Sequence, residues 1–145
     1  MKRILTLMLL AMFVLLLLAG CVPAPAQVSV SDAWAYPIDI GSAGGVFMTI
    51  TNGTGAADKL LEAHTDKATM VQLHTMVMAD GSMKMQEIPE IAIPAGGQVV
   101  LKPKDLHVML MDLATSIEEG EKFPVTLRFE KAGEKIVEVT VKANP

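Results

Sequence analysis

Histidine and methionine residues gather in one stretch of the chain, between positions 74 and 111. Two of the three histidines fall here, as do six of the eight methionines that follow an apolar N-terminal segment. His74 is followed after ten residues by Met85, and Met85 after twenty-one residues by His107, with Met109 two positions further on. Two imidazoles and two thioethers make a ligand set for a soft metal ion, and Cu(I) is the natural candidate.

These side chains can act together only if strands present them on common faces, because successive side chains of a strand point in opposite directions. In 107–111 the histidine and both methionines fall on one face. The histidine and both methionines of 73–78 also share one face, and so do the two methionines of 83–85. Contact between His74 and His107 still requires the fold to bring distant segments together.

Core packing is the simpler interpretation of any one of these residues. Methionine fills gaps in hydrophobic cores, and a single histidine on a strand is more often a surface residue than a ligand. The combination favours metal binding, because a His-x-Met pattern occurs twice with Met-x-Met between. His64 lies outside this pattern, and we expect it at the surface.

Composition narrows the classes of function. The chain has 145 residues, room for one domain of ordinary size. Without Lys2 and Arg3 it has ten basic against 16 acidic residues, a net charge of about −6, which disfavours nucleic-acid binding. No phosphate-binding loop or nucleophile motif is present in the sequence, so we expect no enzyme. A blue-copper electron-transfer site needs a cysteine ligand, and the one cysteine stands near the N-terminus.

The N-terminus has the pattern of a lipoprotein signal peptide. Two basic residues precede an apolar run of fifteen residues, which is short for a membrane-spanning helix. The run ends in Leu-Ala-Gly-Cys, a pattern that resembles a bacterial lipobox. We expect residues 1–20 to be removed, Cys21 to carry the lipid, and 21–27 to form a Pro/Ala tether.

The remainder, residues 28–145, is predicted to be one all-β domain. Short segments alternate with a period of two between turn-forming residues, and no long helical stripe occurs. Asp80-Gly81 marks a hairpin. Eight or nine strands at this spacing indicate a two-sheet antiparallel β-sandwich. The expected strands are 28–35, 46–51, 58–63, 70–78, 83–86, 98–101, 106–113, 123–129 and 135–141.

The spacing H-x10-M-x21-H-x-M resembles the signature of the periplasmic copper-A (PCuAC-type) chaperone family. The segments LHTMVM, IPAGGQVVLKP and LHVMLM are similar to that family's most recognisable blocks. The resemblance implies a cupredoxin-like Greek-key β-sandwich with a partly exposed Cu(I) site. Its metal ligands would be His74, Met85, His107 and Met109, with Met76 as a secondary candidate.

The family resemblance also implies what the site is for. Copper would be delivered toward the CuA site of cytochrome c oxidase, alongside Sco-type thiol proteins, and some relatives also handle Cu(II). Lys104, Asp105 and Asp112 stand where relatives often have glycine or other small residues, which affects the expected shape of the loop before His107.

Two other functions stay open from the sequence. A copper-sequestering or resistance lipoprotein would use the same site for storage, and a metal-free sandwich would act as an adhesion or assembly module. In each case the protein is expected outside the cytoplasm, anchored to a bacterial membrane on its periplasmic side or on the outer face of the cell membrane.

Overall fold

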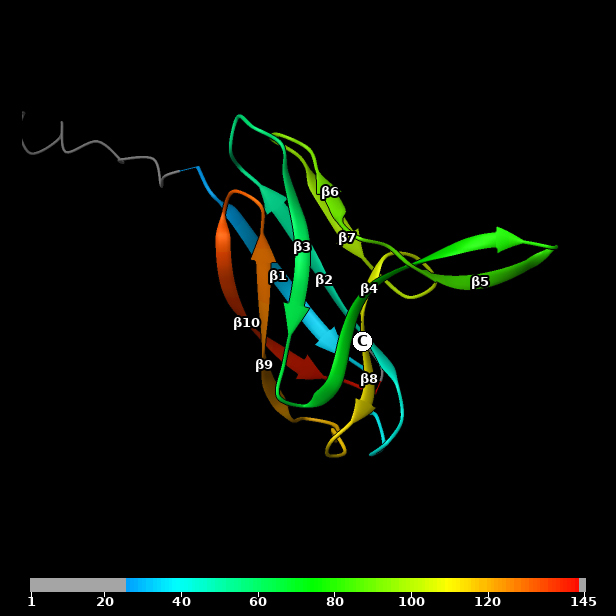
Figure 1. Cartoon of the computed structure of the whole chain (residues 1–145). Coiled ribbons are helices and arrows are strands. Elements are labelled where there is room, and N and C mark those ends of the chain that lie inside the picture. The colour runs from blue at the N-terminus through cyan, green and yellow to red at the C-terminus, as the bar shows by residue number, and fades with distance from the viewer. Residues whose placement is uncertain (1–25, 144–145) are drawn as a thin grey trace, which may run out of the picture.

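The computed structural model describes residues 26–143 as an all-β domain (Figure 1). No helix long and apolar enough to cross a membrane occurs among these residues. The predicted signal peptide 1–20 and the lipidation site Cys21 lie outside the described residues. The ten strands are β1 (Val28–Ala35), β2 (Gly44–Asn52), β3 (Asp58–His64), β4 (Ala68–Ala79), β5 (Ser82–Glu87), β6 (Ile91–Ile93), β7 (Gln98–Leu101), β8 (His107–Leu113), β9 (Lys122–Phe129) and β10 (Gly133–Val141).

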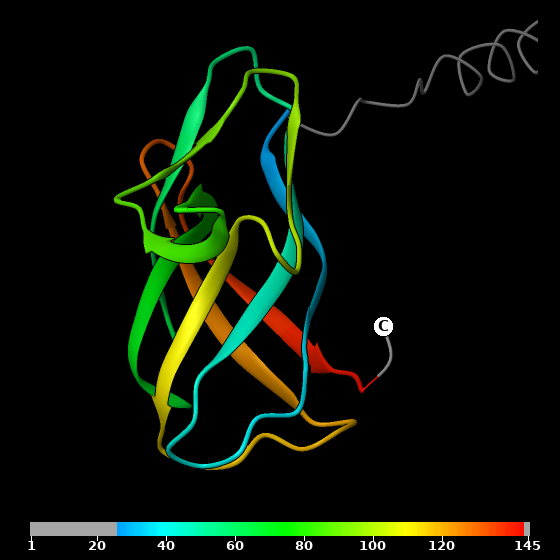
Figure 2. The same ribbon diagram turned by 90° about the vertical axis from the view of Figure 1, so that its right-hand side faces the viewer.

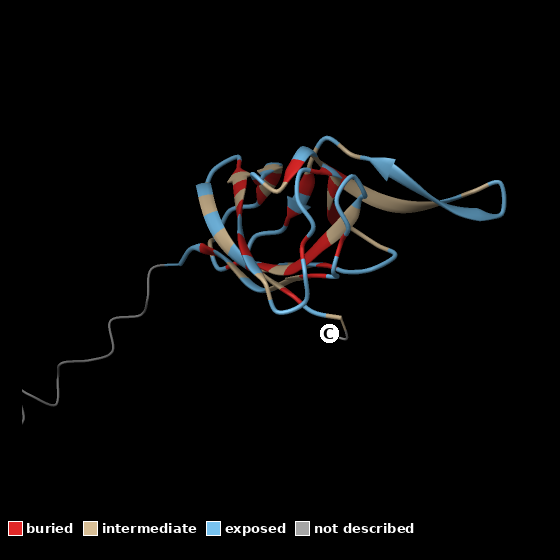
Figure 3. Ribbon diagram, turned by 90° about the horizontal axis from the view of Figure 1, so that it is seen from below, coloured by how far each residue is buried: buried red, intermediate tan, exposed pale blue. Residues whose placement is uncertain are grey.

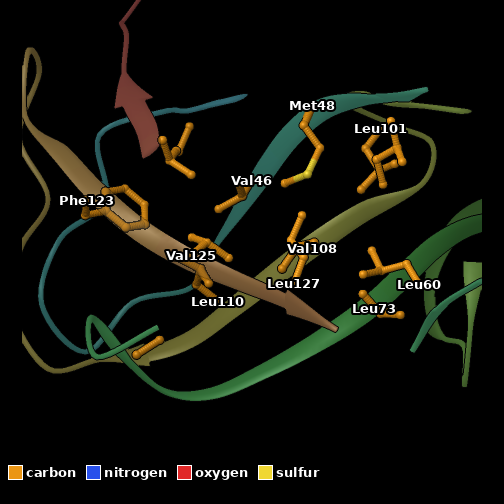
Figure 4. Packing of buried hydrophobic residues seen from close by; sticks show 14 of the residues in the cluster. Val46, Met48, Leu60, Leu73, Leu101, Val108, Leu110, Phe123, Val125 and Leu127 are labelled. Carbon is orange, nitrogen blue, oxygen red and sulfur yellow. The ribbon is translucent and has the colours of Figure 1, made fainter. Parts of the chain in front are cut away.

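The strands form one continuous hydrogen-bonded path in the order β5-β4-β8-β2-β1-β10-β9-β3-β6, with β7 paired to β2. Every pairing is antiparallel except that of β1 with β10. The path curls round on itself (Figure 3), and side chains of β2 and β8 meet those of β9 in the core (Figure 4). Val46, Val108 and Leu127 are fully buried at this contact. The predicted all-β sandwich is confirmed.

All nine predicted strands are present, with ends that differ by a few residues. The strand missed by the sequence analysis is β6, which pairs with β3. It has only three residues and lies between Pro89 and Pro94. Three residues are too few for period-two alternation to be recognised, although Ile91 and Ile93 are both buried in the core.

Strand β4 changes partner part of the way along its length. Its first part, from Ala68 to His74, pairs with β8, while its second part, from His74 to Ala79, pairs with β5. The β4–β5 hairpin therefore leaves the sandwich as a projecting arm (Figure 1). Its tip turns at Asp80 and Gly81, both with positive φ, the conformation of a two-residue hairpin turn.

A buried carboxylate joins β3 to the turn between β9 and β10. Asp58 is 3% exposed and accepts backbone N–H bonds from Lys59, Lys131 and Ala132 at 2.7–2.9 Å. Burial alone would raise the pKa of Asp58, but the three N–H groups stabilise the ionised form and hold the pKa below its usual value. The charge is therefore part of the folded state at neutral pH.

We predict that Asp58→Asn destabilises the domain by about 1–3 kcal/mol, because the amide replaces an acceptor with a donor beside backbone donors. A carboxyl with a lowered folded-state pKa stabilises the fold above its unfolded pKa. That stability is lost as pH falls below about 4 toward the folded-state pKa. Urea unfolding at several pH values should show a weaker acid dependence in the variant. Asp66→Asn, at a fully exposed side chain, is the control; equal effects of both substitutions would contradict the assignment.

Candidate metal centre

His74 lies at the point where β4 changes partner, so it has a cross-strand neighbour on each side. Its partner on β8 is His107, and its partner on β5 is Glu87. Directly opposed residues of antiparallel strands have close Cβ atoms. The two imidazole centroids are accordingly 5.8 Å apart, with the rings inclined at 64°. Residues separated by more than thirty positions in the sequence are thus in contact.

The methionines of the predicted set lie on the same side of the sheet. Met85 of β5 is paired with Met76 of β4, and Met109 of β8 is flanked by Gln72 on β4 and Gly45 on β2. An open cleft of about 270 Å³ is lined by Met76, Met85, Met109 and His107. These lining residues belong to the arm and to β8, and Gly45 of β2 lines the cleft as well. Figure 2 looks at the domain from the side on which the arm projects.

His107 is the buried polar residue of the cleft, with 5% of its surface exposed. Its Nδ1 lies 2.8 Å from the backbone carbonyl oxygen of Asp105. A carbonyl oxygen only accepts, so Nδ1 carries the proton and donates it. The lone pair is therefore on Nε2, and the hydrogen bond fixes the orientation of the ring, as backbone carbonyls often do for histidines that bind metals.

His74 has the complementary arrangement. Its Nε2 lies 2.9 Å from the side-chain oxygen of Gln72, so Nε2 carries the proton. Nδ1 is buried and has no hydrogen-bond partner among the described residues. Burial and the neighbouring His107 lower the pKa of His74, against an opposing effect of Glu87. A neutral imidazole with an unsatisfied nitrogen is well suited to a metal ion.

Gly45 and Phe47 shape the floor of the cleft. A Cβ atom on Gly45 would lie 2.7 Å from the tip of the Phe47 ring, closer than van der Waals contact allows. Phe47 in turn stacks at 4.6 Å on Trp34 and lies 6.3 Å from His107. The glycine thus leaves room for the Phe47 ring, which lies close to His107.

Two residues, one on each side of Met109 in the sequence, have backbone conformations that favour glycine. Lys104, which lines the cleft, has φ of +64°, and Asp112, at the other end of β8, has φ of +53°. The resemblance implied small residues in relatives at these two positions. The chain keeps the left-handed conformation with larger side chains.

Between residues 26 and 143, no group of three or more His, Cys, Asp or Glu side chains could hold a metal ion. A site at the cleft would need thioether sulfur, and thioethers select soft ions such as Cu(I). The donor set therefore suits a soft metal ion.

The structure brings His107, Met85 and Met109 to one cleft, together with Met76, and places His74 against His107 rather than in the cleft lining. His64 is exposed on β3, as predicted. Sequence reasoning missed Gln72, although its position two residues before His74 puts it on the same strand face. It also missed Gly45 and Phe47, which act through tertiary contacts.

The sequence of the domain is similar to those of known proteins. Residues 28–141 match the sequence profile of the family described as "Putative lipoprotein LpqE-like". The chain belongs to the LpqE-like lipoprotein family. A relative, "Putative lipoprotein Lxx21020" of Leifsonia xyli, is 36% identical over 141 residues, covering 89% of this chain and 84% of its own. A Rickettsia prowazekii protein without an assigned role, RP573, is 28% identical, covering 82% and 68%.

The fold of this LpqE-like chain is similar to that of several solved structures. The solution structure of "CuI-DR1885" from Deinococcus radiodurans is 33% identical, with a TM-score of 0.62, covering 87% of this chain and 84% of that one. The "Copper-bound PCuAC domain from PmoF2" has a TM-score of 0.69 at 24% identity, covering 83% and 97%, and shows the shared fold. The predicted resemblance to PCuAC-type proteins is confirmed.

We predict that Gly45→Ala displaces the Phe47 ring and destabilises the domain by about 1–3 kcal/mol, the usual effect of overpacking. Trp34 is the one tryptophan of the chain and stacks on Phe47, so its fluorescence should report the displacement. Gly55→Ala is the matched control, because a Cβ there meets no atom within 4 Å. An unchanged Trp34 emission and melting temperature in Gly45→Ala would show that the ring is not tightly held.

Proposed function

We propose that this protein is an extracytoplasmic, lipid-anchored copper chaperone that binds Cu(I) through His74, Met85, His107 and Met109. The observation that carries the proposal is the direct pairing of His74 with His107 beside the methionine-lined cleft. Met76 is a secondary ligand, because it is paired with Met85 and lines the same cleft. The lipoprotein description of the family and of a relative supports the anchor at Cys21.

The ligand set explains how the protein could hold copper and also release it. Imidazole and thioether are both neutral ligands, so they do not offset the +1 charge of the ion, and a thiolate acceptor should bind it more tightly. Met85 is about half exposed, which leaves the ion accessible to an acceptor. Outside the cytoplasm thioethers have a further advantage, since they cannot form disulfides. The "CuI-DR1885" relative supports the reduced state.

The proposed acceptors are the CuA subunit of cytochrome c oxidase and Sco-type thiol proteins, as the family resemblance implies. The proposed role of the chain is to supply ligands for copper, without a catalytic group. Cu(II) binding would have to use harder ligands, and Glu87, the cross-strand partner of His74, is the nearest carboxylate by strand register.

We predict that Met109→Leu and His107→Phe each weaken Cu(I) binding by at least about a hundredfold, above the range typical when an outer-shell partner is removed. Both replacements roughly preserve side-chain volume, so the fold should persist. Titration against a competing Cu(I) chelator measures the change. Met48→Leu, in the core, and His64→Phe, at an exposed histidine, are the matched controls. Equal loss in controls and site variants would remove this site from consideration.

We predict that Gln72→Leu weakens Cu(I) binding by about 10–100-fold while the ligands stay in place. The Gln72 side-chain oxygen holds the proton on Nε2 of His74 and thereby keeps Nδ1 free. Without it the imidazole would lose its preferred tautomer and orientation. The same chelator competition applies; tighter binding in Gln72→Leu would mean that copper uses Nε2 of His74 instead.

Delivery and storage differ in what the cell loses without the protein. Deletion of the gene should lower cytochrome c oxidase activity and leave copper tolerance intact, and added copper should restore the oxidase. Loss of copper tolerance with normal oxidase activity would favour a sequestering lipoprotein that uses the same cleft. Complementation with the Met109→Leu variant, compared with Met48→Leu, ties either phenotype to the site.

A further inference from the structure

The projecting arm carries methionines beyond the proposed site. Met78 of β4 is paired with Met83 of β5, next to the Met76–Met85 pair and on the same face of the hairpin. Met78 is 69% exposed and Met83 is 49% exposed. They cannot be core residues, since all six residues of β5 are exposed and the outer part of the arm projects from the sandwich (Figures 1 and 3).

Three of these four arm methionines are outside the primary ligand set. Met76 lies two residues before Met78 on β4, on the same face, and Met83 is the cross-strand partner of Met78. Cross-strand Cβ atoms are about 4.5–5.5 Å apart, and the next pair along the strand is within reach of long side chains. Methionine has three rotatable bonds, so the sulfur atoms can adapt to one another. Three thioethers form a sufficient ligand set for a soft monovalent ion.

The charged residues of the arm do not compete for such an ion. Lys84 alternates with Met83 and Met85, so its side chain leaves from the opposite face, where it pairs with Asp80 at 2.8 Å. The methionine face from the Met76–Met85 pair to the Met78–Met83 pair therefore presents sulfur. The next carboxylate on that face is Glu87, at the inner end of the arm opposite His74 and away from Met78 and Met83. This selects against hard divalent cations.

We propose that Met76, Met78 and Met83 form a second, outer Cu(I) site, from which copper passes inward along the arm to His74, His107, Met85 and Met109. This inference rests on the proposed copper function. The outer site contains only thioethers and is exposed, so it binds more weakly and exchanges faster than the inner site. Because Met76 belongs to the outer set and is the cross-strand partner of Met85, the two sites are contiguous.

The test uses the full-length protein in detergent micelles, with methionine methyl groups labelled with ¹³C, and Ag(I) as a redox-inert substitute for Cu(I). The first equivalent should shift the methyl signals of Met85 and Met109, and a second equivalent those of Met78 and Met83. The double variant Met78→Leu, Met83→Leu should lower the capacity from about two ions to about one, with the affinity for the first ion unchanged. It should also slow copper uptake at limiting free copper.

The matched control is the double variant Met70→Leu, Met111→Leu. These residues form another cross-strand methionine pair, on β4 and β8, with Met70 also exposed. The control should keep the full capacity. Binding of one ion with Met78 and Met83 unmoved would overturn the outer site while the proposed function stands, whereas no binding of Ag(I) or Cu(I) at all would reject the proposed function itself.

Discussion

The exchange of strand partners at His74 is the constraint on which the site depends. β8 and β5 pair with opposite edges of β4, and the two pairings overlap at His74. One residue is therefore opposed by His107 on one side and by Glu87 on the other. From His74 to the tip β4 pairs with β5, which sets Met76 opposite Met85 on the strand that carries the histidine. Backbone hydrogen bonding, set by the sandwich, thus determines which ligands meet.

The sandwich contributes a rigid inner half of the site and the arm an exposed outer half. His107 is fixed by the carbonyl of Asp105 and supported by Phe47, whereas Met85 is on a strand whose residues are all exposed. The imidazole rings are the parts of the site that hydrogen bonds hold in place, because metal binding depends on their tautomer and orientation. The flexible thioethers lie at the opening, where an incoming or departing ion would pass. This division suits a protein that must bind a metal ion and transfer it.

Most strands, and the faces on which the candidate ligands lie, could be predicted from the sequence for physical reasons. Strand side chains alternate, so the pattern of β8 already placed His107 and Met109 on one face and Val108 and Leu110 in the core, as the structure shows. The hairpin at Asp80-Gly81 and nearly all strands followed from turn chemistry. Family resemblance, not local pattern, supplied the link between the two histidine segments, because strand register across the sheet cannot be deduced from spacing. The short strand β6, the Gln72 contact and the role of Gly45 all depend on tertiary neighbours.

X-ray absorption spectroscopy of the Cu(I)-loaded protein tests the central claim most directly, because it identifies the atoms bound to copper. The account predicts nitrogen scatterers at about 2.0 Å and sulfur scatterers at about 2.3 Å, as for His and thiolate ligands of similar ions. The sulfur contribution should fall stepwise in Met109→Leu and Met85→Leu. A spectrum with only nitrogen and oxygen neighbours, or sulfur scattering of unchanged amplitude when both substitutions are combined, would contradict it.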